Sequence, residues 1–124
     1  MRPVLPLFAL LPLCLWGGCP ALAADCSDTA VDQADMTICA DTHFKEADAA
    51  LNASYAQLMK DLDPDTAAKL RAAQRLWLPY RDAACEAEAF LFDGGSMQPM
   101  VQLDCMTRLT KARVEDLTAF APQG

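Results

Sequence analysis

Apolar residues recur every three or four positions across residues 36–62, and this repeat restricts the fold more than any other feature of the sequence. Side chains at this spacing share one face of an α-helix, so the segment predicts one long helix with a buried stripe. Thr29, with Asp32 three residues later, is expected to cap the N-terminus of this helix. The stripe consists of Met36, Ala40, Phe44, Ala47, Leu51, Tyr55, Leu58 and Leu62.

A second helix is predicted over residues 64–92. Asp63 can cap it, and Pro64 suits its first position because a proline there loses no helical hydrogen bond. Pro79 lies inside this segment and is expected to kink the helix without ending it. The predicted inner stripe of this helix holds Leu70, Ala73, Trp77, Arg81, Ala84, Glu88 and Leu91.

The clearest loop signal is the stretch Asp93-Gly94-Gly95-Ser96. A third helix is expected to begin between residues 98 and 100, with Leu103, Met106, Thr110, Arg113 and Leu117 on one face. No segment alternates apolar and polar residues for long enough to predict a strand. The fold class predicted is therefore all-α, a small bundle in which a short entry segment precedes three helices joined by tight turns.

The first 23 residues have the pattern of a cleaved signal peptide. Arg2 precedes an uncharged apolar stretch over residues 4–16, and Ala21-Leu22-Ala23 matches a small-residue cleavage site. We therefore expect an exported protein, periplasmic or secreted, whose folded domain is residues 24–124. Lipid attachment at Cys19 is the alternative interpretation of the same segment. No later stretch resembles a transmembrane helix.

Four cysteines remain after the predicted cleavage, which in a short exported chain indicates two disulfides. Residue 95, in the glycine loop, is the midpoint between Cys85 and Cys105, so the two face each other across a helical hairpin. This favours Cys85–Cys105 and leaves Cys26–Cys39. Counting in the same way from the turn at Pro64 places Cys39 level with residue 87, close to Cys85, so a Cys39–Cys85 disulfide is also possible. We expect no metal and no cofactor, because there is no CxxC pair and only one histidine, His43.

The charge balance limits the partners of the protein. The chain has 10 Lys and Arg against 17 Asp and Glu; cleavage removes Arg2 alone and leaves 9 against 17, or −8. An acidic surface repels phosphate, so nucleic-acid binding is not expected. Negative charge suits a basic protein partner instead. We expect the domain to be a monomer.

Several polar residues fall at positions where neighbouring helices meet. Asp48 lies about one turn from the level of Arg81, Asp82 lies level with Arg108, and Trp77 lies level with Arg113. One interpretation is an acid–base catalytic site. We favour a structural network that fixes helix register, because a slim bundle offers no cleft in which catalytic groups converge. Its members are Asp48, Asn52, Trp77, Arg81, Asp82, Arg108 and Arg113. His43 is expected to be partly exposed and inert, and no catalytic residue is predicted.

Motifs within residues 26–117 carry a family resemblance. They are Met36–Ala40, Ala47–Tyr55, Ala73–Cys85, Gly94–Ser96 and Cys105–Arg113. In this order they resemble the LprI-like lysozyme inhibitor N-terminal domain family of small exported four-cysteine bacterial proteins. Pro79 departs from the family pattern, in which a polar residue is usual. The resemblance implies a disulfide-containing helical domain and a lysozyme-type partner.

Function is expected to be binding rather than catalysis. The primary hypothesis is a lysozyme (muramidase) inhibitor that acts by occlusion of a basic lysozyme-type protein. The alternative is a non-inhibitory envelope interaction module, and an enzyme is the least favoured class. The candidate contact is the loop between the second and third helices, whose residues are Phe92, Asp93, Gly94, Gly95 and Ser96.

Overall fold

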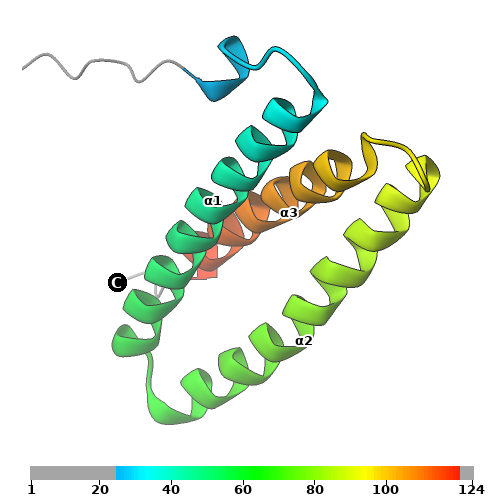
Figure 1. The fold of residues 1–124 in the computed structure, drawn as a ribbon. Helices are drawn as coiled ribbons and strands as arrows, with labels where there is room; N and C mark the ends of the chain where they lie inside the picture. The colour runs from blue at the N-terminus through cyan, green and yellow to red at the C-terminus, as the bar shows by residue number, and fades with distance from the viewer. Residues whose placement is uncertain (1–24, 121–124) are drawn as a thin grey trace, which may run out of the picture.

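The computed structural model describes residues 25–120, and within that range the chain forms three long helices (Figure 1). They are α1 (Gln33–Asp61), α2 (Pro64–Ala89) and α3 (Gln98–Phe120). Two short 3-10 helices, η1 (Cys26–Asp28) and η2 (Phe90–Phe92), precede α1 and follow α2. The predicted all-α, three-helix fold with two disulfides is confirmed. The predicted leader, with Cys19, lies outside the described residues.

The caps of the first two helices differ in how well the sequence predicted them. The prediction of Thr29 as N-cap of α1 is wrong: the cap is Asp32, whose carboxylate accepts from the amide of Asp35 at 2.9 Å. Thr29 instead closes η1, where its hydroxyl donates to the Cys26 carbonyl at 3.0 Å. Asp63 caps α2 as expected, and Pro64 is the first helical residue.

Helix α2 continues through Pro79 without a break. Its inner face holds Leu70, Arg81 and Cys85 as buried residues. The predicted stripe is wrong at Ala73, Glu88 and Leu91, which are exposed, and it missed Gln74 and Ala89, which are buried. From Leu70 the buried face advances four residues rather than three. After Ala89 the tighter turn of η2 changes the direction of the side chains that follow.

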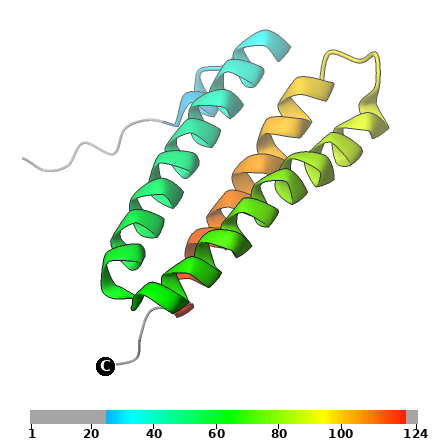
Figure 2. The same cartoon turned by 90° about the horizontal axis from the view of Figure 1, so that it is seen from below.

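Helix α3 packs along both α1 and α2, and Figure 2 shows it lying between and behind them. The apolar core lies toward the α1–α2 turn and is built on Leu51, Leu58, Leu70 and Leu117. Residues packed against this cluster include Tyr55, Trp77 and Val114. None of the helices within residues 25–120 combines the length and apolar character needed to span a bilayer.

Both disulfides lie at the opposite end of the bundle from this core. The structure joins Cys26 to Cys39, with 5.5 Å between the Cα atoms, and Cys85 to Cys105, with 5.4 Å. The first ties η1 to α1, and the second ties the end of α2 to α3. The alternative pairing that the sequence left open, Cys39 with Cys85, is absent from this structure.

Candidate partner-binding surface

The loop between α2 and α3 is a tight turn that depends on its two glycines. Its backbone is closed by amides of Asp93, Gly95 and Gln98, which donate to carbonyls three residues earlier at 2.9–3.2 Å. Gly94 has φ of +75°, a conformation that L-residues rarely adopt. A Cβ on Gly95 would lie 3.1 Å from the Phe92 carbonyl oxygen. The chain therefore reverses here over a short, defined path.

This turn presents a group of exposed apolar side chains, which we call the loop patch. Leu91 is 80% exposed and Phe90 is 67% exposed, and Phe92 and Met97 are also exposed. The sequence prediction of a contact site included neither Phe90 nor Leu91, and it placed Leu91 in the core. The run Phe-Leu-Phe directly before Asp-Gly-Gly is the signal that identifies the patch. Isolated exposed apolar residues are ordinary, but four around one turn are typical of an interaction surface.

The base of the loop is held covalently. Cys85 and Cys105 are 0% and 2% exposed, so their disulfide lies inside the α2–α3 interface directly below the turn. At the surface beside it, Arg108 of α3 donates to Glu88 of α2 at 2.7 Å. The disulfide and this ion pair therefore hold α2 and α3 together directly beneath the loop patch.

Exposed acidic side chains lie at the same end of the bundle as the loop patch. Glu86 lies in the last turns of α2, Asp93 in the loop and Asp104 in α3, and all three are exposed. Within residues 25–120 none of the three takes part in an ion pair. Asp93 accepts a hydrogen bond from the Gln98 side chain at 3.4 Å. This end of the bundle therefore combines apolar contact area with uncompensated negative charge.

A polar network centred on Arg81 lies deeper in the bundle. The Arg81 side chain, from α2, is 8% exposed. It donates to Asp82 at 2.9 Å, to Asp48 of α1 at 3.3 Å and to the buried Thr110 hydroxyl of α3 at 3.4 Å. Its guanidinium carbon also lies 5.2 Å from the Phe44 ring centroid. One side chain therefore contacts all three helices and satisfies its donors.

The remaining predicted network members divide into two groups. Arg113 donates to Gln74 at 3.0 Å and lies 5.8 Å from the Trp77 ring centroid, and Asn52 donates to Asp48 at 3.4 Å. Arg108 lies outside the network. Its partner is Glu88 rather than Asp82, because Arg81 takes the Asp82 carboxylate. Thr110 and Gln74 are network members that the sequence analysis did not assign.

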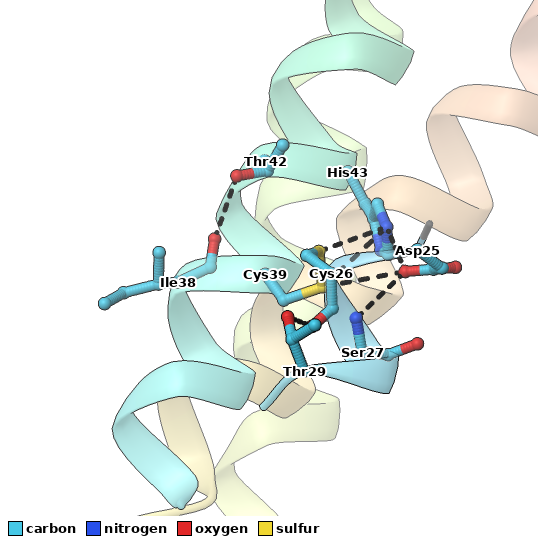
Figure 3. Close-up of a disulfide and its surroundings, with 8 residues drawn as sticks. All are labelled: Asp25, Cys26, Ser27, Thr29, Ile38, Cys39, Thr42 and His43. Carbon is cyan, nitrogen blue, oxygen red and sulfur yellow. Dashed lines mark hydrogen bonds and ion pairs between the residues drawn. A yellow bond between two sulfur atoms is a disulfide. The ribbon is translucent and has the colours of Figure 1, made fainter. Parts of the chain in front are cut away.

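His43 has three polar neighbours at the start of α1 (Figure 3). Its Nε2 lies 3.1 Å from Asp25 Oδ1, 3.6 Å from Cys26 Sγ and 3.8 Å from Cys39 Sγ. Asp25 Oδ1 also accepts from the Ser27 amide at 3.1 Å. This hydrogen bond and the nearby His43 ring lower the pKa of the Asp25 carboxyl from its ordinary value. His43 is partly exposed as expected, with its side chain 34% exposed, but its contacts with Asp25 and the two sulfurs were not predicted.

Comparison with known proteins assigns the chain to a family. The family model described as Lysozyme inhibitor LprI matches residues 24–117. The chain belongs to the lysozyme inhibitor LprI family. An uncharacterized protein of Rhizobium meliloti (strain 1021) is 38% identical over 134 aligned positions, which cover 94% of each chain. No solved structure matches the chain.

The LprI match includes every feature described above. The four paired cysteines, the Arg81 network, the loop patch and the His43 cluster all lie between residues 24 and 117. As an LprI family member, the protein is similar to inhibitors rather than to enzymes.

Proposed function

We propose that this LprI family member is an exported binding protein that inhibits a basic, lysozyme-type muramidase by occluding its substrate groove with the loop patch. The observation that carries the proposal is the group of exposed apolar residues on a disulfide-braced turn, led by Phe90 and Leu91. Large apolar side chains at the centre of an interface supply most of the binding energy. A loop already held in one conformation loses less entropy when it binds.

Charge supports the same partner. The acidic residues at the same end as the loop patch, Glu86, Asp93 and Asp104, face solvent without an ion-pair partner within the described range. Such rim charges accelerate encounter with a basic protein and make the association rate depend on salt. Two disulfides in so small a domain suit the oxidising compartments outside the cytoplasm. The signal-peptide pattern of residues 1–23 supports export as well.

A second candidate function is a non-inhibitory interaction module of the cell envelope. Leu76 and Tyr80 are 75% and 61% exposed, and they lie one turn apart on α2, several turns before the loop. A helix face with this spacing suits a partner that packs along α2 rather than one that receives a protruding loop. The two candidates therefore use separable surfaces.

One experiment separates these surfaces. Lysozyme activity would be measured with the wild-type domain, with the pair Phe90→Ser and Leu91→Ser, and with the pair Leu76→Ser and Tyr80→Ser. If the proposal holds, the first pair raises the concentration for half-inhibition at least about tenfold, while the second pair leaves it unchanged. All four side chains are exposed, so both variants are expected to stay folded. Inhibition that survives the loop pair, or a wild-type domain without inhibition, contradicts the proposal.

A further inference from the structure

Four potential metal ligands converge at the N-terminal end of α1 (Figure 3). One ligand atom each from Asp25, Cys26, Cys39 and His43 lies within 4.8 Å of every other. They come from three places: Asp25 and Cys26 from the start of η1, Cys39 from the second turn of α1, and His43 one turn later. In the structure described, the two sulfurs are bonded to each other, so they are not free to coordinate an ion.

The distances among these atoms nevertheless match a tetrahedral zinc site. With zinc about 2.3 Å from sulfur and about 2.0–2.1 Å from nitrogen or oxygen, the N–S and O–S edges of a tetrahedron are about 3.6 Å and the N–O edge is about 3.3 Å. The structure has 3.6 and 3.8 Å from His43 Nε2 to the sulfurs, 3.8 Å from Asp25 Oδ1 to Cys39 Sγ, and 3.1 Å from Asp25 Oδ1 to His43 Nε2. The sulfur–sulfur edge has to open to about 3.8 Å. The sixth edge, from Asp25 Oδ1 to Cys26 Sγ, is no longer than 4.8 Å.

We propose that reduction of the Cys26–Cys39 disulfide turns this cluster into a zinc site with two thiolates, one imidazole and one carboxylate as ligands. A dithiol reductant supplies two electrons and two protons: the S–S bond breaks, two thiols form, and the dithiol becomes a disulfide. Zinc then displaces both thiol protons to solvent and binds the two sulfurs, His43 Nε2 and Asp25 Oδ1. The set of four ligands is one that zinc favours in proteins.

The surroundings make this disulfide the more accessible of the two. Cys26 is half-buried, and the side chains of His43 and Asp25 are 34% and 54% exposed, so a small reductant and a hydrated ion can approach. Cys85 and Cys105 are buried in the α2–α3 interface. The Ser27 amide that donates to Asp25 Oδ1 orients the carboxylate, as hydrogen bonds to metal ligands commonly do. The site therefore keeps η1 attached to α1 in either redox state.

Cobalt is the probe that reports this site directly. The mature protein would be treated with limiting dithiol until alkylation and mass spectrometry show that Cys26 and Cys39, but not Cys85 and Cys105, are reduced. Titration with Co²⁺ should then give thiolate-to-cobalt charge-transfer and tetrahedral d–d bands that saturate at one ion per chain. Zinc should remove these bands, and the oxidised protein should show none. The reduced protein should keep its helical circular dichroism, since Cys85–Cys105 is intact.

Variants separate the four-ligand site from a simple pair of thiols. His43→Ala and Asp25→Asn should each weaken Co²⁺ and Zn²⁺ binding at least about tenfold. Glu46→Gln, one turn along α1 and also exposed, is the matched control and should bind as the wild type does. Absence of the charge-transfer band in folded protein with both thiols free overturns the proposal. So does unchanged affinity in both His43→Ala and Asp25→Asn. None of these measurements depends on lysozyme inhibition.

Discussion

The guanidinium of Arg81 on α2 lies 3.3 Å from the carboxylate of Asp48 on α1, and the same nitrogen lies 3.4 Å from the Thr110 hydroxyl on α3. One charged side chain therefore joins all three helices at mid-bundle. A buried charge that loses its partners is costly, whereas the same pair in water contributes little. This contact is where a single substitution should have the largest effect on stability.

Replacing Arg81 with alanine should lower the free energy of unfolding by about 2–5 kcal/mol, because the buried Thr110 hydroxyl loses its donor and a cavity opens beside the Phe44 and Trp77 rings. Arg108→Ala is the control, because its pair with Glu88 is at the surface and should be worth about 1 kcal/mol or less. Urea unfolding monitored by circular dichroism measures both. Equal effects of the two substitutions would show that Arg81 is not the central contact.

The disulfide pairing predicts a specific set of cross-linked peptides. The mature, unreduced protein should contain no free thiol in a denaturing thiol assay, and proteolysis should yield Cys26 joined to Cys39 and Cys85 joined to Cys105. Recovery of a peptide joining Cys39 to Cys85 would contradict the structure. Each bridge closes a loop of one to two dozen residues and should stabilise the domain by about 3 kcal/mol.

Gly94→Ala should destabilise the domain by about 1–2 kcal/mol, because alanine at a φ of +75° brings its Cβ too close to the backbone. No other atom lies within 4 Å of the added Cβ, so the cost is conformational alone. Gly94→Asn should cost less, since asparagine tolerates this conformation. The midpoint of urea unfolding would show the order. A Gly94→Asn variant less stable than Gly94→Ala would contradict this explanation.

Acid should weaken the cap of α2. Hydrogen bonds from Thr66, together with the Asp65 amide, hold the pKa of Asp63 below its ordinary value of 3.8. A carboxyl whose pKa is lower in the folded state stabilises the fold above pH 3.8, and this stabilisation is lost as the pH falls through the lowered pKa. Asparagine also caps helices but does not titrate. The melting temperatures of wild type and Asp63→Asn should therefore be similar near neutral pH and separate on acidification, with wild type losing more. Melting temperatures that fall in parallel would contradict the assignment.

The polar residues of the loop should tune rather than determine lysozyme inhibition. Changing Asp93 and Ser96 together to alanine removes one rim charge and one hydroxyl while leaving the loop patch intact. We expect weaker inhibition and a smaller difference between assays at low and high salt, because rim charges act mainly on the association rate. If the folded variant inhibits as well as the wild type at both salt concentrations, these residues only connect the helices and the contact lies elsewhere.

Periodicity was sufficient to predict the helices but not their exact faces. The start of α3 and the Asp63–Pro64 cap follow from local chemistry, so the sequence alone determines them. Thr29 and Asp32 are both good capping residues, and only the conformation of η1 selects Asp32. Leu91 is exposed because the helix changes from α to 3-10 geometry after Ala89. A prediction based on a constant α-helical repeat cannot include this change.

Contacts between helices were predictable only where residues lie at the same level. Counting from the glycine turn places Cys85 opposite Cys105 and Trp77 opposite Arg113, and these residues do meet. The same count places Asp82 opposite Arg108, but these two residues do not pair. Asp82 pairs with Arg81 and Arg108 pairs with Glu88, and the count along the chain cannot choose between such competing partners. The His43 cluster was missed because η1 folds back onto α1, which brings Asp25 next to a residue 18 positions away.

The leucine core and the two disulfides occupy opposite ends of the bundle, with the Arg81 contact between them. The two ends are therefore stabilised by different interactions. Apolar packing holds the end near the α1–α2 turn. A change toward reducing conditions acts on the other end, where the cross-links, η1 and the loop patch are. A reductant that opens the buried Cys85–Cys105 bridge as well as Cys26–Cys39 would therefore loosen the end that carries the loop patch, while the leucine core stays packed.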